Sequence, residues 1–377
     1  MTAGIYEFDP FGRRCFRPHA PRVPLLEDVL DALDPAAAAV REFERALEGW
    51  RPPGLIGRLF ARLDAVHSSG AEGSTTTFTD LMEYESSRRS AVDPDDAAAV
   101  AACAAAFEAE APDAGDPIEM SLAMHRRLFA QSRDRVMAAS AGNLKERTNG
   151  TADHEAPGGL FYYTQPASAP LALAEWRDFT LASDPRTHEM VRQALSHWMF
   201  EHIHPVADGN GRIGRLLVPV MLSRKGATRV ACAFFGEAVH EDKDLYIEAL
   251  KAARISGDMT AWTRLMLSFL GRSAAANLDR LTRLATVEAQ WRSALAGFRS
   301  DSMVHKLAPF ALTRPAFTIE DARRAIGGTF ASVNTAAAHL VDAGILVISD
   351  RARRDRLFLA GAVLDIFDRF WPQPARG

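Results

Sequence analysis

Apolar residues recur three or four positions apart along most of the chain, the spacing that one face of an α-helix requires. The pattern predicts a helix, a short loop, and a second helix that begins near Gly209 to Gly211. Pro219 falls inside the second helix, where its ring would meet the carbonyl of Arg215 and bend the helix. The apolar positions that define the two helices are Val191, Leu195, Trp198 and Met199, then Ile213, Leu216, Leu217, Val220 and Met221.

Helical spacing elsewhere predicts a mostly α-helical fold. Further helices are expected at about residues 25–50, 55–66, 97–111, 118–129 and 275–300. Residues 159–166 differ, because they are rich in β-formers and are flanked by turn-forming residues. They predict a small β-hairpin, and on the pattern alone a plain surface hairpin explains them as well as a functional flap does.

The end of the chain, from about residue 301, has a pattern of its own. Two predicted helices, at 317–326 and 332–340, precede two short strands at 344–348 and 356–359. This order predicts a winged helix, with a basic tip at Arg351, Arg353 and Arg354 between the strands. Residues 301–377 hold ten basic and eight acidic residues, and the candidate recognition helix has no Arg or Lys. DNA binding and a protein-contact or dimerisation role therefore both stay open.

Length and composition bound the organisation of the chain. A chain of 377 residues can form two or three domains. We expect an N-terminal helical region at 1–95, a catalytic core at 96–275, a connecting helix at 276–300 and the winged helix at 301–377. The net charge of −4 gives no overall nucleic-acid signal. The sequence shows neither a membrane-length apolar run nor a secretory leader, and its three cysteines form no pair or metal spacing, so we expect a cytoplasmic protein without membrane contacts.

The predicted loop and the helix after it hold most of what phosphate chemistry needs. His204 titrates near neutral pH and suits a general base, and Asp208 is the kind of oxygen ligand that Mg²⁺ prefers beside phosphates. The glycines at 209–211 would open a helix N-terminus whose free N–H groups bind anions. Arg212 and Arg215 share a helix face and can fork onto phosphate oxygens. A capped corner with a solvated aspartate and surface arginines would account for single residues, but not for the whole string.

The string His204-Pro205-Val206-Ala207-Asp208-Gly209-Asn210-Gly211-Arg212-Ile213-Gly214-Arg215 resembles the signature of the Fic family. Val206 departs from the usual Phe and should weaken packing more than chemistry. The family mostly transfers AMP from ATP to a hydroxyl of a protein. The resemblance implies a Fic helical core, His204 as the base on the target hydroxyl and Asp208 as the Mg²⁺ ligand. It implies nucleotide binding by Gly209, Asn210, Gly211, Arg212 and Arg215.

A second stretch, from Ser68 to Gly73, matches the family pattern Ser/Thr-x-x-x-Glu-Gly. Helical apolar spacing precedes it, and Gly73 is a plausible helix stop. Alone, Glu72 would be a solvated carboxylate at a helix end. In the family class with an N-terminal inhibitory helix, this glutamate pairs with the second arginine of the signature, here Arg215. The resemblance implies that Ser68, Glu72 and Gly73 form an inhibitory element that keeps the activity low.

The resemblance extends to three weaker features. A flap that docks the target segment as an added strand falls at Leu160, Phe161, Tyr162 and Tyr163. Tyr246 falls where the family tends to have a tyrosine pair near the adenine, although a core tyrosine is nearly as well supported. Residues 141–145 are a loose version of a basic element of the family, so a role for Lys145 is open.

These observations predict a protein adenylyltransferase that uses ATP and Mg²⁺ on a protein Ser, Thr or Tyr, with self-modification and a homodimer both compatible. One alternative at the same site is removal of AMP, with Glu72 positioning water. Transfer of phosphate or of another nucleotide is a second. An alternative of another class is a DNA-binding regulator whose Fic core senses a nucleotide.

Overall fold

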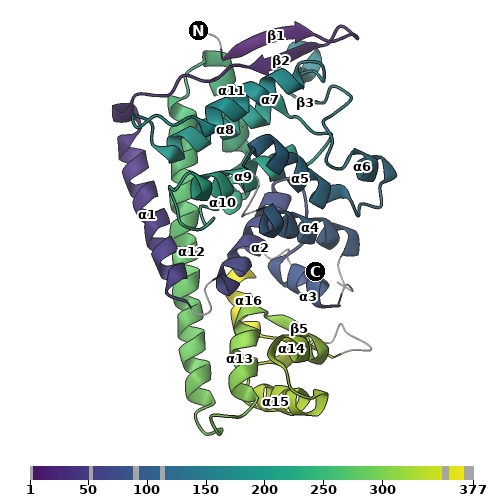
Figure 1. The fold of residues 1–377 in the computed structure, drawn as a ribbon, viewed down its shortest axis with the longest axis vertical. Coiled ribbons are helices and arrows are strands. Elements are labelled where there is room, and N and C mark those ends of the chain that lie inside the picture. The colour runs from purple at the N-terminus through teal and green to yellow at the C-terminus, as the bar shows by residue number, and fades with distance from the viewer. Residues whose placement is uncertain (1–2, 51–53, 88–92, 111–114, 350–355, 369–377) are drawn as a thin grey trace. The chain divides into compact units, whose positions relative to one another are not determined.

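The computed structural model describes residues 3–50, 54–87, 93–110, 115–349 and 356–368. The fold is mostly helical, as predicted, with two small sheets (Figure 1). Among the described residues, no helix has the length and apolarity needed to span a membrane. The α-helices are α1 (Leu30–Glu48), α2 (Leu55–Gly70), α3 (Phe78–Ser87), α4 (Pro94–Glu110), α5 (Pro117–Phe129), α6 (Arg135–Ser140), α7 (Ala169–Leu181), α8 (Glu189–Ile203), α9 (Asn210–Arg224), α10 (Gly236–Glu241), α11 (Lys243–Ser256), α12 (Thr260–Ala294), α13 (Val304–Thr313), α14 (Ile319–Ile326), α15 (Phe330–Asp342) and α16 (Gly361–Asp368).

The chain divides into two compact units that do not follow the predicted boundaries. The first unit contains Met1–Arg45, His67–Glu72 and Ala102–Ala275, and the second contains Ala46–Val66, Gly73–Ala101 and Ala276–Gly377. The C-terminal residues therefore share a unit with two N-terminal segments instead of forming a module alone. The expected connecting helix at 276–300 is also not separate, because α12 already begins at Thr260 and runs without interruption to Ala294.

Helices α8 and α9 form the centre of the first unit, and the loop between them carries the signature residues. Helix α8 packs against α7 and α9, and α9 also packs against α5. The apolar positions that predicted α8 and α9 are all buried, from Val191 to Met221. Asp116 caps α5 by accepting a hydrogen bond from the backbone N–H of Ile118, which fixes where this helix begins. Helix α9 begins at Asn210, as predicted.

A four-stranded sheet lies in the first unit, in the order β1-β2-β4-β3. Its strands are β1 (Gly4–Phe8), β2 (Arg14–Pro18), β3 (Gly150–Ala152) and β4 (Leu160–Tyr162). Of the hairpin predicted at residues 159–166, only β4 lies in that range, and its antiparallel partner is β3, which the sequence did not predict. The β1–β2 hairpin was not predicted, and it adds strands to the region at 1–95 for which only helices were expected. Because β2 pairs with β4 at Cys15 and Tyr162, the open edge of the sheet on the flap side belongs to β3.

The second unit contains the predicted C-terminal elements and a strand that the sequence did not predict. Helices α14 and α15 each begin with a capping box, on Thr318 and Thr329. Strands β5 (Ala316–Thr318), β6 (Val347–Ile348) and β7 (Leu357–Leu359) form a sheet in the order β5-β7-β6. The predicted basic tip at 350–355 lies outside the described residues, so a winged helix stays a prediction.

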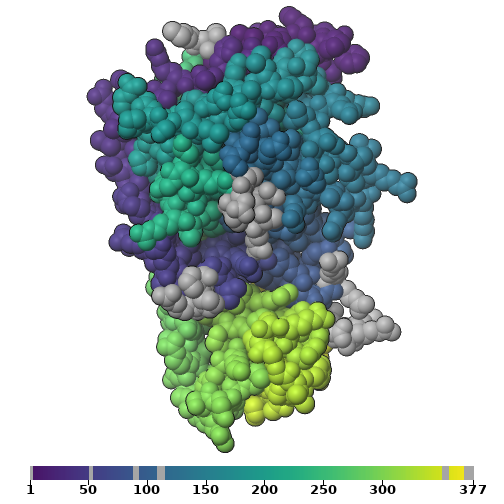
Figure 2. Space-filling view, in the orientation of Figure 1, coloured from purple at the N-terminus to yellow at the C-terminus, as the bar shows by residue number. Residues whose placement is uncertain are grey.

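The C-terminal helix α16 anchors the N-terminal segments of the second unit. The ring of Phe367 stacks on that of Phe78, with centroids 4.5 Å apart, and meets the ring of Phe60 edge-on. The Asp368 carboxylate accepts hydrogen bonds from the backbone N–H groups of Phe78 and Thr79, which open α3. The residues of α13 to α15, light green to yellow-green in Figure 2, are packed together.

Candidate active site

The backbone of His204 has an unusual conformation at the end of α8. His204 is the C-cap of α8 and has φ 50° and ψ 58°, in the left-handed region. Among the described residues it is the one non-glycine residue with positive φ. This conformation costs a residue with a Cβ on the order of 1–2 kcal/mol. Surrounding contacts must therefore hold it, and strain of this kind concentrates at functional sites.

The His204 ring is held in a definite tautomer and orientation. Its Nδ1 lies 3.1 Å from the carbonyl oxygen of Glu201, and a carbonyl only accepts, so Nδ1 carries the proton. In the neutral ring, Nε2 then has a free lone pair. Tyr163 stacks on the imidazole, with ring centroids 3.9 Å apart and an interplanar angle of 7°. Burial, together with the nearby Lys145 cation, holds the pKa of His204 well below its usual range, so the ring is unprotonated at neutral pH.

The N-terminus of α9 follows the loop and offers free backbone N–H groups. Gly209 is the N-cap and has φ 78°. A Cβ at Gly209 would lie 2.9 Å from the ring of Phe129, so both the backbone angle and the space require glycine. The Asn210 side chain is buried and serves the loop itself: Oδ1 accepts from the Val206 N–H and Nδ2 donates to the Val206 carbonyl. A phosphate at this place would therefore meet the backbone of Asn210 first.

Asp208 and Arg212 lie at the open side of this helix N-terminus. The Asp208 side chain is 59% exposed, and its Oδ2 lies 3.6 Å from a terminal nitrogen of the Arg212 guanidinium. That guanidinium stands over the Phe129 ring at 5.5 Å. The described residues contain no group of three acidic, His or Cys side chains that could hold a metal alone. A single exposed carboxylate fits Mg²⁺ of the kind that takes its other ligands from water and nucleotide phosphates.

Arg215 is buried and held by hydrogen bonds to the segment His67–Glu72. Its Nε donates to the Ser68 hydroxyl at 2.8 Å, and one terminal nitrogen donates to the Ser68 carbonyl at 2.9 Å and the Glu72 carboxylate at 2.5 Å. Burial would raise the pKa of Glu72, but the Arg215 cation outweighs it and holds this pKa below its usual range. Glu72 is therefore ionised at neutral pH.

The Glu72 carboxylate also covers the start of α9. A Cβ built on Gly211 would collide with the Glu72 Oε1. The carboxylate thus lies against the second residue of α9, where the free N–H groups attract anions. Gly73, three residues after the end of α2, has φ 100° and lets the chain turn away after Glu72. Helix α2 ends at Gly70, three residues before Gly73, which the sequence predicted as the stop.

Behind these groups lies a buried polar cluster that the sequence interpretation did not use. The Tyr246 hydroxyl lies 2.8 Å from Nε2 of His197, and both residues are buried. This position favours the alternative of a core tyrosine over contact with a base. Burial raises the pKa of the neighbouring Glu201 to about 7. Glu201 lies three residues before His204 and could have been singled out only by its charge on an apolar helix.

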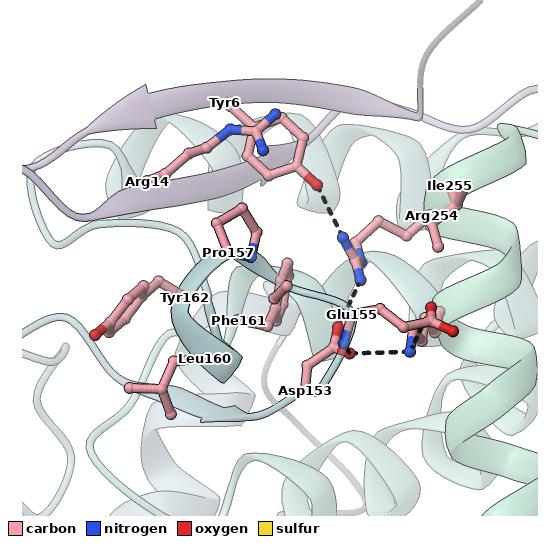
Figure 3. Close-up of a pocket in the computed structure, with 12 residues that line it drawn as sticks. Tyr6, Arg14, Asp153, Glu155, Pro157, Leu160, Phe161, Tyr162, Arg254 and Ile255 are labelled. Atoms are coloured by element: carbon pink, nitrogen blue, oxygen red, sulfur yellow. Dashed lines mark hydrogen bonds and ion pairs between the residues drawn. The ribbon is translucent and has the colours of Figure 1, made fainter.

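The predicted flap residues divide between the core, the surface and His204. Leu160 is exposed, and Phe161 is buried under the Arg254 guanidinium, which lies 4.1 Å from its ring centroid. Tyr162 pairs with β2 and β3, and Tyr163 covers the His204 ring. A pocket of about 220 Å³ beside the flap, lined by residues of β1, β2, the β3–β4 hairpin and α11, is drawn in Figure 3. None of the signature residues lines this pocket.

Comparison with known proteins identifies part of the chain. Residues 117–222 match the Fic/DOC family, so this segment, which includes the loop from α8 to α9, is a Fic/DOC domain. A protein adenylyltransferase Fic of Nematostella vectensis is 28% identical over 171 residues, which is 45% of this chain and 35% of that protein. One of Drosophila willistoni is 25% identical over 243 residues, 62% of this chain and 44% of that protein. The chain thus spans less than half the length of these relatives.

A solved structure extends the likeness of the fold beyond this segment. A Fic family protein from Desulfovibrio desulfuricans G20 has a TM-score of 0.60 and 18% sequence identity, and the match covers 90% of this chain and 98% of that one. At this identity the likeness concerns the fold alone. Both units of the chain therefore have counterparts in one known architecture.

Proposed function

We propose that this protein transfers AMP from ATP to a Ser, Thr or Tyr hydroxyl of a protein, and that Glu72 keeps this activity low. The observation that carries the proposal is the neutral His204, with Nδ1 bound and Nε2 free, one loop away from the N-terminus of α9. A base next to an anion-binding helix end can activate a hydroxyl for attack on a phosphate that the helix end holds. The adenylyltransferase names of the relatives support the same reaction.

The reaction balances with the residues present. His204 Nε2 takes the proton of the target hydroxyl, and the hydroxyl oxygen forms a bond to the α-phosphorus of ATP. The bond from the α-phosphorus to the oxygen that bridges to the β-phosphorus breaks, and pyrophosphate leaves. Backbone N–H groups at the start of α9 and the Arg212 guanidinium stabilise the negative charge on the phosphates, because they are already oriented before reaction. A Mg²⁺ ion held by Asp208 would neutralise phosphate charge.

The inhibitory role of Glu72 is proposed from its two contacts. Its carboxylate neutralises Arg215 and lies over Gly211, so an anionic γ-phosphate would have to compete for the same cation and the same helix end. Two anions in one such place repel each other. Loss of the Glu72 carboxylate should therefore allow ATP to bind in the orientation that the reaction needs.

The test uses the purified Glu72→Gly protein with ATP labelled at either the α- or the γ-phosphorus. We expect covalent label on protein from α-labelled ATP only, and none with Glu72→Gly combined with His204→Ala. Label from γ-labelled ATP would show phosphate transfer instead. Unlabelled GTP or UTP that competes better than ATP would show transfer of another nucleotide. Loss of label from pre-labelled protein in the wild type would show removal of AMP.

A further inference from the structure

The loop that carries His204 is held from outside by a segment that is distant in sequence. Three carbonyls flank the left-handed residue, those of Ile203, Pro205 and Val206. The Lys145 ammonium donates to the Ile203 carbonyl at 3.1 Å, and the Lys145 backbone N–H donates to the Pro205 carbonyl at 2.9 Å. The Asn149 amide donates to the Val206 carbonyl at 3.0 Å. Every carbonyl beside His204 thus has a partner in residues 145–149.

Holding a loop with a buried lysine costs free energy, because the ammonium group must be removed from water. The side chain of Lys145 is buried, and burial lowers its pKa to about 7. Nζ donates to Asn149 Oδ1 at 2.7 Å and to the Ile203 carbonyl, so two acceptors face the ammonium. Burying a cation without a carboxylate partner costs stability that a packed apolar side chain would not. The placement of a lysine here therefore points to a role beyond packing.

The segment that carries Lys145 and Asn149 is itself fixed at several points. The Gly142 N–H donates to His125 Nδ1 at 3.0 Å, and the Thr148 hydroxyl donates to Asp9 at 2.8 Å. The Tyr163 N–H donates to the Asn149 carbonyl at 3.1 Å. Since Tyr163 also stacks on His204, one segment controls both the backbone of the base and the ring that covers it.

We propose that Lys145 and Asn149 are positioning residues for His204: they hold its left-handed backbone so that Nε2 faces the target hydroxyl. The inference rests on the proposed transferase function and adds to it the residues that orient the base. Displacing the base lowers the reaction rate steeply, because proton transfer requires a defined distance. A shift of about 1 Å can lower the rate on the order of a hundredfold. Neither residue belongs to the signature.

Lys145 also affects the charge of the base. The charged groups that act on His204 are the Lys145 ammonium, which disfavours its protonation, and the Glu72 carboxylate, which favours it. The buried His202 adds to the effect of Lys145 only where it is itself protonated, because burial lowers its pKa to about 3. Tyr163, stacked on the ring, is neutral because burial raises its pKa well above its usual value. Lys145 is protonated at the pH values where His204 titrates, because its own pKa is the higher one. Removing the ammonium should raise the pKa of His204. The transfer rate should then begin to fall at a higher pH on the acid side of the pH profile.

The test compares three variants in the full chain, each combined with Glu72→Gly so that the rate is measurable. Lys145→Met removes the charge but keeps the length of the side chain, Lys145→Arg keeps the charge, and Asn149→Ala removes one carbonyl donor. Lys225→Met is the matched control, because the Lys225 ammonium also donates to two carbonyls, those of Leu181 and Ala182, far from the loop in sequence. The readouts are kcat and KM for ATP, the pH profile, and the melting temperature.

We expect Lys145→Met to lower kcat by about ten- to a hundredfold with an unchanged KM for ATP, and to shift the acid limb to higher pH. Asn149→Ala should lose less, because Asn210 also donates to the Val206 carbonyl. Lys145→Arg should recover part of kcat, and Lys225→Met should behave as the parent. A folded Lys145→Met protein with the parent's kcat and pH profile would overturn the proposal. A loss of ATP binding in parallel with kcat would also overturn it, in favour of a role in overall folding.

A readout that needs no transferase activity separates this proposal from the proposed function. The pKa of His204 can be measured by NMR of histidine-labelled protein, with the signal assigned from its absence in His204→Ala. A higher pKa in Lys145→Met than in the parent supports the positioning role even where no AMP transfer is found. An unchanged pKa contradicts it even where AMP transfer is confirmed.

Discussion

A general base must be neutral at the working pH and correctly placed, and in the proposed role of His204 different contacts serve the two requirements. Burial and the Lys145 cation lower its pKa, and the Glu201 carbonyl fixes its tautomer. We therefore expect the transfer rate of the Glu72→Gly protein to stay constant as the pH falls through 6.5, and to decline only below that value. Stopped-time assays from pH 5 to pH 8 check this. An acid limb at or above pH 6.5 would show that the imidazole is not the buried, neutral base described here.

The pair of Glu72 and Arg215 gives a second prediction at the residue scale. Glu72→Gly should raise self-modification well above that of the wild type, because it frees Arg215 for the γ-phosphate. Adding Arg215→Ala should abolish the gain, since the cation that benefits from the release is gone. Glu155→Gly, which removes a mostly exposed carboxylate elsewhere in the first unit, is the control and should leave the rate low. Equal self-modification by the wild type and Glu72→Gly would show that Glu72 does not inhibit.

The placement of site residues could be predicted from the sequence where the residues are close together in the chain. His204, Asp208 and Arg212 lie within nine positions, so their spacing alone places them on one loop and one helix start. Lys145 and Asn149 could not be found in this way. The carbonyls that they meet are 57 to 60 positions away in the chain, and nothing in the local pattern around them indicates which carbonyls these are.

At the scale of elements, periodicity predicted α8 and α9 because a helix is a local structure with local hydrogen bonds. The pairing of β2 with β4 joins Cys15 to Tyr162, and a contact between residues so far apart leaves no periodic trace in either strand. The β1–β2 hairpin was missed because its strands are five residues long and show no clear alternation of buried and exposed positions.

The start of α9 gives a prediction at this scale, with a matched control. Gly209 and Gly158 have nearly the same φ, 78° and 75°, but a Cβ would meet the Phe129 ring at Gly209 and nothing within 4 Å at Gly158. Both alanine variants should lose on the order of 1 kcal/mol from backbone strain. Only Gly209→Ala should also lose ATP binding, because it displaces the helix N-terminus. Calorimetry and ATP titration measure both effects, and equal ATP affinity in the two variants would exclude a role for this helix end.

At the scale of the whole molecule, the division into units changes the interpretation of the C-terminal residues. The sequence predicts a separate domain at 301–377, but Phe367 and Asp368 pack with the segments at 46–66 and 73–101. Removing residues 301–377 would expose Phe60 and Phe78, so we expect the truncated chain to be poorly soluble. The sequence could not show this arrangement, because the partners lie almost 300 positions apart.

A single substitution tests what the second unit contributes to inhibition. Helix α2 is continuous from Leu55 to Gly70, and its Phe60 packs against Phe367. Phe367→Ala should cost about 3–5 kcal/mol. Because short helices depend on their packing, the first turns of α2 should fray, and the short remainder should hold Glu72 less firmly. We expect a lower melting temperature and self-modification between that of the wild type and that of Glu72→Gly. Phe330→Ala, at a 59% exposed phenylalanine of the same unit, should change neither. Wild-type self-modification in a destabilised Phe367→Ala protein would show that Glu72 is held by its contacts with Arg215 alone.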